Sequence, residues 1–335
     1  GQSNHDGHSL MTQTWRLATF NIESLDFRPA EPELFDRRLA AHRPVLAGLD
    51  ADIVCLQEVN AQKIAGAKSR GFAALKRLLA GTPLEAFFVA TSVNPDTGHP
   101  ADVHNLAILS RWPIAASGQI HHDLVAQQPV PPLGVSASQS NATALRWDRP
   151  TQTADISLPG GRLLHVVNLH LRAPRAVPFG TGRGRSYPGI SRDWARGFYL
   201  AALKRQGQAL EARLHLEEVF DDRPDALIAV CGDLNSDTYE TPAKILRAAP
   251  DEADGALDPA RSLEALESRV AQDRRFSVLH AGRPVLLDHI LASPALAALC
   301  TGVDILNDGL ADEFAADDSV AGSFHAPVVA TFSAA

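Results

Sequence analysis

Short apolar runs recur along the chain, and several of them lead directly into polar residues. The clearest run covers residues 226–230 and is followed by Gly232, Asp233, Asn235 and Asp237. Its length and its content of Val, Ile and Leu predict a strand that is buried on both faces. The end of such a strand can hold a cation or an attacking water, because the packed backbone behind it cannot shift freely. Asp and Asn are also common turn residues, so a plain turn is the alternative for this stretch alone.

The same pattern predicts most of the other elements. Further strands are expected over residues 15–22, 52–59, 106–110, 163–171, 285–291 and 326–332. Helical patterns cover residues 33–49, 66–80 and 192–219. Pro44 can divide the first helix in two, because proline suits a first helical turn better than a helix interior. Residues 119–141 are expected to form a loop with one edge strand at most, and residues 251–273 an irregular surface insertion.

The two-residue period of a strand groups polar side chains on common faces. Asn21 and Glu23 share one face, and Asn168 and His170 share another. Within each pair the two side chains can therefore contribute to one site. A capping Asn beside a solvated Glu is the alternative for the first pair.

Adjacent polar residues, in contrast, must divide between the two faces of a strand. Gln57 and Glu58 point to opposite sides, so only one of them can reach a site that contains Asn21. We expect that residue to be Glu58, because a carboxylate directly after a buried run is rarely left unpaired. A cation would satisfy it, and so would a Lys or Arg partner. Asp288 and His289 likewise face opposite ways.

The composition is typical of a globular protein. The chain has 335 residues, 45% of them hydrophobic, and no run that approaches the eighteen apolar residues of a membrane span. The candidate residues extend from 21 to 325, which favours a single domain over residues 11–335. Met11 is the only methionine, so residues 1–10 are expected to be the remnant of an expression tag. Cys55 and Cys231 lie in apolar strand patterns, which, with no signal peptide, predicts reduced core cysteines and a cytoplasmic protein.

One segment differs in charge from the rest of the chain. The formal net charge of −8 argues against nonspecific coating of nucleic acid. Residues 171–198 nevertheless carry six arginines against one acid, together with Tyr187 and Trp194. Arginine forks bind phosphate and aromatic rings stack on bases, so we expect Arg172, Arg175 and these aromatic residues to contact a phosphate-bearing substrate. A solvated loop paired with acids elsewhere is the alternative.

Taken in order, these segments resemble the endonuclease/exonuclease/phosphatase superfamily, which includes pancreatic deoxyribonuclease, abasic-site nucleases, neutral sphingomyelinases and inositol-polyphosphate phosphatases. The likeness extends over residues 15–333. It rests on Asn21 with Glu23, residues 56–58, 106–110, 168–170 and 232–235, Asp288 and residues 323–325. The resemblance implies an α/β (α+β) fold, a four-layer sandwich of two packed mixed β-sheets flanked by helices. It places the site at one rim of the sandwich.

The resemblance also implies cleavage of a phosphodiester that depends on Mg²⁺ or Mn²⁺. Glu58 would bind the metal, with Asn21 and Glu23 beside it. This assignment is chemically reasonable, because oxygen ligands favour magnesium or manganese over zinc. A hard cation neutralises the nonbridging oxygens of a phosphodiester and activates a water.

The remaining roles follow from the same resemblance. Asp233 would orient or deprotonate the attacking water, and Asn235 would hold a phosphate oxygen. His170 and His325 would stabilise the charged transition state or move protons. Asp288 would fix the orientation of His325, since a histidine tethered to an aspartate keeps one tautomer and favours its protonated form.

The chain departs from the superfamily pattern at one position. Many members have an aspartate immediately before the last histidine, and Phe324 stands there in this sequence. A phenylalanine side chain cannot bind a cation, so the contact is missing or comes from another acid such as Asp317 or Asp318. The number of metal ions is therefore left open.

The sequence thus predicts a metal-dependent phosphodiesterase that uses a metal-activated water, with nucleic acid as the first expected substrate. Asn168, Arg172, Arg175, Tyr187 and Trp194 are expected to contact that substrate. A hydrolase of small-molecule or lipid-derived phosphoesters is the alternative favoured by the acidic overall charge. A catalytically inactive binding protein is a second alternative, suggested only by Phe324. No protein partner is evident, and endo or exo action and oligomeric state are not determined by the sequence.

Overall fold

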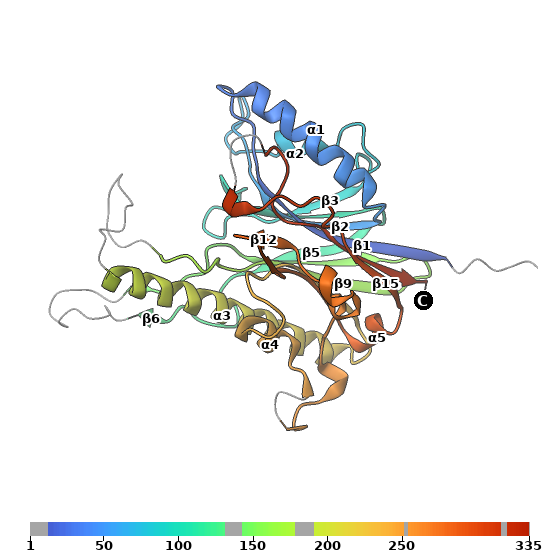
Figure 1. The fold of residues 1–335 in the computed structure, drawn as a ribbon. Helices are drawn as coiled ribbons and strands as arrows, with labels where there is room; N and C mark the ends of the chain where they lie inside the picture. Colours follow the sequence, from blue (N-terminus) through green and yellow to red (C-terminus); the bar gives the residue numbers. More distant parts are fainter. Residues whose placement is uncertain (1–12, 131–142, 178–190, 251–253, 316–319, 335) are drawn as a thin grey trace, which may run out of the picture.

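Two six-stranded sheets pack face to face at the centre of the protein, with helices on both outer sides (Figure 1). The computed structural model describes residues 13–130, 143–177, 191–250, 254–315 and 320–334. Tyr187, Asp317 and Asp318 lie outside the described residues. Three apolar layers hold the arrangement together: one between the sheets, one under each set of helices. The protein is therefore the four-layer α/β sandwich that the sequence predicts.

The first sheet has the strand order β15-β16-β1-β2-β4-β3. Its strands are β1 (Thr14–Leu25), β2 (Ile53–Val59), β3 (Phe88–Thr91), β4 (Asn105–Ser110), β15 (Cys300–Ile305) and β16 (Val328–Ser333). β1 and β2 are parallel, and the other neighbouring strands are antiparallel. The helices α1 (Pro32–Gly48) and α2 (Ala73–Leu79) cover its outer face.

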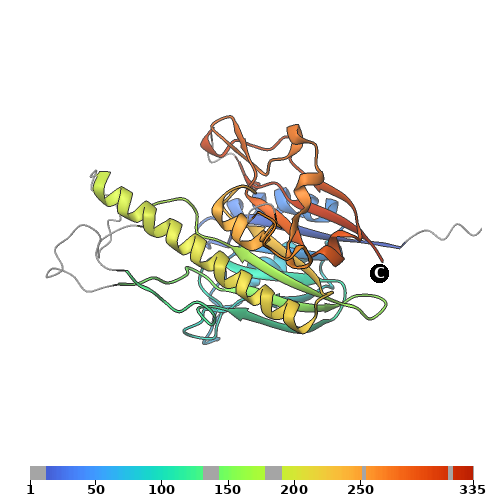
Figure 2. The same ribbon diagram turned by 90° about the horizontal axis from the view of Figure 1, so that it is seen from below.

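The second sheet has the order β11-β14-β10-β9-β8-β5. Its strands are β5 (Ile114–Ile120), β8 (Thr151–Ser157), β9 (Leu163–His170), β10 (Leu227–Asp233), β11 (Glu264–Ala265) and β14 (Asp288–Ala292). β9 and β10 form its parallel pair. The helices α3 (Ser191–Asp222) and α4 (Thr241–Arg247) pack on its outer face, and the first turns of α3 extend beyond the sheet (Figure 2).

Smaller elements complete the chain. They are the paired strands β6 (Pro129–Val130) and β7 (Thr143–Ala144), the hairpin β12 (Val278–His280) and β13 (Arg283–Val285), the helix α5 (Pro294–Ala297), and the 3₁₀ turns η2 (Pro259–Arg261), η3 (Leu266–Arg269), η4 (Gln272–Arg274) and η5 (Glu313–Ala315). Cys55, Cys231 and Cys300 are free thiols. Within the described residues, no helix combines the length and the apolar character that crossing a membrane requires.

Several predicted bounds need correction. The predicted strand over 285–291 is interrupted, because β13 ends at Val285 and β14 begins at Asp288. α1 continues through Pro44 as one helix, since Phe35, Leu39 and Leu46 lie on a single buried face that packing holds together. The predicted helix over 66–80 is reduced to α2. The strands β3, β5, β8 and β15 were not predicted, because β3 has only four residues and polar or small residues interrupt the apolar pattern of the other three.

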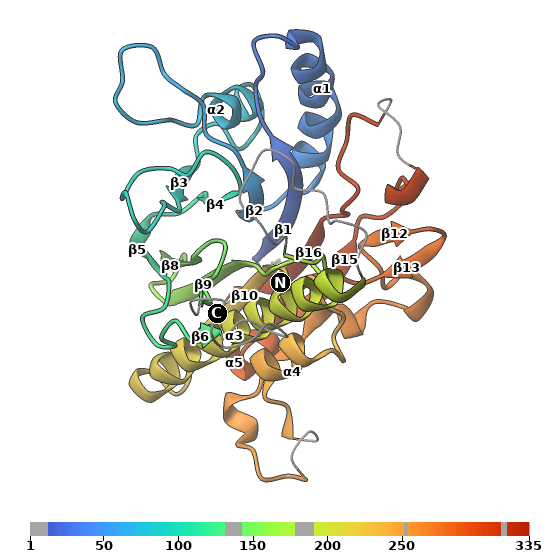
Figure 3. The same ribbon diagram turned by 90° about the vertical axis from the view of Figure 1, so that its left-hand side faces the viewer.

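The carboxyl ends of β1, β2, β9 and β10 point to the same side of the molecule, the left-hand side of Figure 1, which faces the viewer in Figure 3. Buried polar side chains link the two sheets behind this end. The amide of Asn168 donates to the carbonyls of Leu56 and Ala107 in the first sheet, at 3.1 and 3.2 Å. Its Oδ1 accepts from Gln57 Nε2 at 2.9 Å. These hydrogen bonds fix the position of the sheets relative to each other just below the strand ends.

Candidate active site

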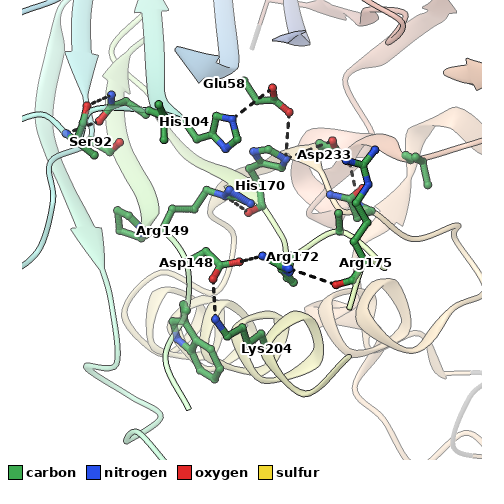
Figure 4. A pocket seen from close by; sticks show the side chains of 18 of the residues that line it. Glu58, Ser92, His104, Asp148, Arg149, His170, Arg172, Arg175, Lys204 and Asp233 are labelled. Carbon is green, nitrogen blue, oxygen red and sulfur yellow. Dashed lines mark hydrogen bonds and ion pairs between the residues drawn. The ribbon is translucent and has the colours of Figure 1, made fainter. Parts of the chain in front are cut away.

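A cleft of about 1150 Å³ opens at the end of the sandwich where these strands finish (Figure 4). Glu58 comes from the first sheet, and His170, Asp233 and Asn235 come from the second. His325 lies before β16 and also lines the cleft. Residues that are far apart in the sequence, from 58 to 325, therefore share one cavity. Most of the predicted catalytic residues lie on its floor.

The turn after β10 delivers Asp233 and Asn235 to this floor. Gly232 has φ +142°, and a Cβ there would lie 1.9 Å from the carbonyl oxygen of Leu169 on β9. Only glycine permits this close approach of the two strands. Beyond it, the N–H of Asn235 donates to Asp233 Oδ1 at 3.0 Å, and Asn235 Nδ2 donates to the carbonyl of Leu171 at 2.8 Å. The turn is therefore held on both sides, which fixes the direction of the Asp233 carboxyl.

Asp233 is the point where side chains of both sheets converge. Its Oδ2 accepts from Asn21 Nδ2 at 3.0 Å. The Nε2 atoms of His170 and His325 lie 3.5 and 3.8 Å from the same oxygen. Burial raises the pKa of Asp233 to about 7, and repulsion from Asp288 acts in the same direction. Asp233 can therefore accept and release a proton near neutral pH.

Glu58 lies beside Asp233 and shares its amide partner. Asn21 Nδ2 donates to Glu58 Oε1 at 3.1 Å, and the N–H and Oγ of Ser24 donate to Oε2 at 3.0 and 3.2 Å. Glu58 has φ +60°, a conformation that is unusual outside glycine and typical of functional sites. Burial alone would raise the pKa of Glu58, but His104, the Asn21 amide and His325 outweigh it and lower the pKa. Glu58 is therefore held as a carboxylate at the cleft.

The two histidines of the site have opposite electrostatic surroundings. His325 Nδ1 lies 2.7 Å from Asp288 Oδ2. Although burial opposes it, attraction to Asp288 and Asp233 raises the pKa of His325 well above its usual value. Burial and the nearby charge of Arg149 hold the pKa of His170 well below the usual value. The site thus combines a protonated His325 with a neutral His170, and two such rings can take different roles.

Glu23 approaches the site from the end of β1. Its Oε1 lies 4.0 Å from His325 Nε2 and accepts the backbone N–H of Phe324 at 2.9 Å. Burial raises the pKa of Glu23, and Glu58 contributes to this by repulsion. Phe324 therefore contributes its backbone to the site, although its side chain cannot take the place of an aspartate.

The donor set fits a hard divalent cation. Glu58 and Asp233 offer carboxylate oxygens on either side of the Asn21 amide, and the repulsion between Glu58 and nearby Glu23 is what a bound cation would relieve. Asn21 presents its Nδ2 to the carboxylates, so it orients them. One atom each of Asp233, Asp288 and His325 also lie within 4.8 Å of one another. Because Asp288 already accepts a hydrogen bond from His325 Nδ1, we interpret Asp288 in this cluster as an acid that positions His325 and not as a metal ligand.

One wall of the cleft is cationic, and it includes a residue that the sequence did not reveal. Arg172 and Arg175 line this wall, and Asp148 binds both Arg172 Nη1 and Lys204 Nζ, at 3.2 and 2.7 Å (Figure 4). Arg149 is the missed residue. Its Nε donates to the carbonyl of His170 at 2.8 Å, while Nη1 and Nη2 have no hydrogen-bond or ion-pair partner among the described residues. Burial lowers the pKa of Arg149, although Asp148 and Glu58 oppose the shift.

Two residues predicted to contact substrate lie elsewhere. Asn168 is fully buried between the sheets, where its amide donates to backbone and side-chain oxygens, so it does not line the cleft. Trp194 is 52% exposed near the start of α3 and stacks on Phe198 at a centroid distance of 5.0 Å, outside the residues that line the cleft. Tyr187 belongs to the part of the chain that the structure does not describe.

Residues 18–323 match the model of the endonuclease/exonuclease/phosphatase family, and the chain belongs to this family. Membership supports a hydrolase that acts on phosphoester bonds. The fold is similar to that of TDP2 from Caenorhabditis elegans, with a TM-score of 0.55 and 16% identity over 96% of this chain and 98% of that one. None of the curated proteins compared with the sequence matches it.

Two further solved structures have the same fold. An endonuclease/exonuclease/phosphatase protein from Beutenbergia cavernae has a TM-score of 0.53 and 20% identity, over 96% of this chain and 71% of that one. An AP endonuclease from Archaeoglobus fulgidus has a TM-score of 0.50 and 15% identity, over 95% of this chain and 99% of that one. At these identities the likeness concerns the fold.

Proposed function

We propose that this protein is a divalent-cation-dependent phosphodiesterase that acts on nucleic acid. The observation that carries the proposal is the convergence of Asp233, Glu58 and the Asp288–His325 pair on one cleft floor beside a cationic wall. Phosphodiester hydrolysis needs neutralisation of nonbridging oxygens, an activated water and donors for the transition state. The cleft contains a group for each of these demands.

Glu58 and Glu23 would hold the cation, Mg²⁺ or Mn²⁺, with Asn21 Nδ2 orienting the Glu58 carboxylate and Asn21 Oδ1 accepting the backbone N–H of Glu23. When bound, the cation supplies electrophilic stabilisation of the phosphate charge. Asp233 orients the attacking water and takes its proton, for which a pKa of about 7 suits it. Protonated His325 donates to a phosphate oxygen through Nε2, because Asp288 occupies Nδ1.

The remaining polar groups bind the substrate. Asn235 uses one Nδ2 hydrogen on Leu171 and has the other for a phosphate oxygen. Neutral His170 offers Nε2 beside Asp233 and Glu58. Arg149 directs its unpaired guanidinium nitrogens at the cleft, and Arg172 and Arg175 extend the cationic wall for neighbouring phosphates. The name of one structural neighbour, an AP endonuclease, agrees with nucleic acid as the substrate class.

Hydrolysis of small-molecule or lipid-derived phosphoesters is the second candidate. It is favoured by the net charge of −8, which limits attraction of a long polyanion to the surface outside the cleft. The two candidates share the same catalytic groups, so they differ only in the substrate that fills the cleft.

The proposal is tested by hydrolysis of an aryl phosphodiester and the matching monoester with Mg²⁺, Mn²⁺ or chelator. We expect diester turnover that needs a cation and falls at least about 100-fold in His325→Ala and Asp288→Asn. His99→Ala, an exposed histidine that does not itself line the cleft, is the matched control and should retain wild-type turnover. Single-stranded DNA, duplex DNA, RNA and phospholipid vesicles then identify the substrate class. Absence of cation-dependent turnover of every diester would overturn the proposal.

A further inference from the structure

Segment 146–151 brings Arg149 to the cleft, and four residues on one face of α3 hold this segment. We call residues 146–151 the Arg149 segment, and we call Lys204, Gly207, Gln208 and Glu211 the α3 clamp. Their spacing of three, four and seven residues places the clamp on one side of the helix. Each member contacts the Arg149 segment, and none of them was recognised from the sequence.

Glu211 is the central member of the clamp. It is fully buried, and its Oε1 accepts Trp147 Nε1 at 2.9 Å and the backbone N–H of His122 at 3.0 Å. Its Oε2 accepts the backbone N–H groups of Leu124 and Val125, both at 3.0 Å. A buried carboxylate is costly unless its oxygens are fully bonded. Here the bonds tie two separate stretches of chain to one point on the helix.

Gly207 and Gln208 fix the same segment from the adjacent turn. A Cβ on Gly207 would lie 2.4 Å from Cη2 of Trp147, so the indole packs directly on the helix backbone. Glycine is unfavourable inside a helix, and the close packing of Trp147 on the backbone explains why it stands at this position. Gln208 Nε2 donates to the carbonyl of Arg149 at 2.8 Å.

The two central residues of the segment, Asp148 and Arg149, are held as well. Lys204 Nζ binds Asp148 Oδ1 at 2.7 Å, and Arg149 Nε reaches the His170 carbonyl on β9 at 2.8 Å. The ring of Trp147 also stacks on His122 at a centroid distance of 4.2 Å. Arg149 is thus held between the helix and the strand that carries His170. The direction of the Arg149 side chain therefore depends on its contacts with both α3 and β9.

We propose that the α3 clamp is a positioning device for Arg149, in which Glu211 and Gly207 set the location of Trp147 and thereby aim the Arg149 guanidinium at the substrate phosphate. This inference rests on the proposed function, because Arg149 is the phosphate-binding group that it serves. A displacement of about 1 Å at such a group lowers turnover about 100-fold, so a remote clamp has catalytic consequences.

The first test observes Arg149 directly and does not depend on activity. The Nε–H resonance of Arg149, assigned by its loss in Arg149→Lys, is followed by ¹⁵N–¹H spectroscopy. We expect it to shift and to exchange faster with solvent in Gly207→Ala and Glu211→Gln. Gly48→Ala, whose Cβ would meet no atom within 4 Å, and Glu218→Gln, an exposed residue of the same helix, are the matched controls. An unchanged resonance in both clamp variants would overturn the proposal.

The second test separates positioning from a loss of folded protein. We expect Gly207→Ala to lower kcat/KM for the aryl phosphodiester about 10-fold when Arg149 is present, and less than about 2-fold in an Arg149→Ala background. Equal losses in both backgrounds would mean that the clamp acts on general structure, and would overturn the proposal. A wild-type protein with no turnover would overturn the proposed function instead, and the resonance of Arg149 would still decide the role of the clamp.

Discussion

At the residue scale, the site depends on how four acids and two histidines share protons in a small volume. Asp233 lies between Asn21 and His325, and burial raises its pKa to about 7. The Asp288–His325 pair holds a positive charge within 4 Å of it. The neutral and charged forms of Asp233 are therefore close in free energy, which suits a group that takes up a proton and releases it again.

Because the neutral and charged forms of Asp233 are close in free energy, a bound cation should change the pH at which Asp233 titrates. In protein treated with chelator, the Asp233 carboxyl should titrate near pH 7. Addition of Mg²⁺ should lower its pKa, because a nearby cation favours the ionised form. Carboxyl ¹³C spectroscopy measures the titration, and Asp233→Asn assigns the signal. A titration that is the same with and without Mg²⁺ would show that the cation does not bind next to Asp233.

The residue scale also shows where sequence reasoning was limited. Asn168 and His170 share a face of β9, as the alternation predicts, but that face points into the space between the sheets. Only the last residue of the strand emerges at the cleft, so His170 lines it and Asn168 does not. Arg149 gave no sequence signal because it lies in an irregular segment before β8, and its position depends on tertiary contacts with α3.

At the element scale, the close approach of β9 and β10 places His170 next to Asp233. Gly232 permits this approach, because its missing Cβ would occupy the position of the Leu169 carbonyl. The strands that carry site residues were recognisable from their continuous apolar runs, whereas β3, β8 and β15 depend on pairing with neighbours across the sheet. Strong local patterns therefore predicted the strands of the site better than the strands at and next to the sheet edges.

Gly232→Ala should lower the free energy of unfolding by roughly 2 kcal/mol or more, because the added methyl forces β9 and β10 apart. Urea unfolding measures this loss. Gly302→Ala, where a Cβ meets no atom within 4 Å, is the control and should unfold close to wild type. Equal free energies of unfolding for Gly232→Ala and Gly302→Ala would mean that β9 and β10 can move apart without loss of stability.

The contact between α3 and β9 predicts a second effect, on acid stability. His215 Nε2 lies 2.8 Å from His165 Nε2, and burial, with repulsion from His165, lowers the pKa of His215 to about 4. In the unfolded chain, His215 takes up its proton near pH 6.5, whereas in the folded chain it does so only near pH 4. Between these two values the proton favours the unfolded chain, so the free energy of unfolding should fall as pH drops from 6.5 to 4. The slope is at most about 1.4 kcal/mol per pH unit, and partial exposure reduces it.

His215→Gln should flatten this dependence, because glutamine does not titrate. Urea unfolding at several values between pH 7.5 and 4.5 compares the slopes of the two proteins. His42 remains in both, so its own lowered pKa cancels from the comparison. If the free energy of unfolding had the same pH dependence in wild type and His215→Gln, the lowered pKa of His215 would be contradicted.

At the scale of the whole molecule, the site joins the two halves of the sandwich, since Glu23 and Glu58 belong to the first sheet and Asp233 and Asp288 to the second. A cation held by Glu58 and Glu23 beside Asp233 lies where the two sheets meet and is bound only by the folded chain, so it should stabilise the entire fold. At a Mg²⁺ or Mn²⁺ concentration 100 times its Kd, the gain is about 2.7 kcal/mol. Glu58→Gln should remove most of this gain, whereas Glu218→Gln, far from the acids on an exposed part of α3, should keep it. Thermal unfolding with and without chelator measures the difference. An undiminished gain in Glu58→Gln would place the cation at Asp233, Asp288 and His325 instead, where it would have to displace the hydrogen bond between Asp288 and His325.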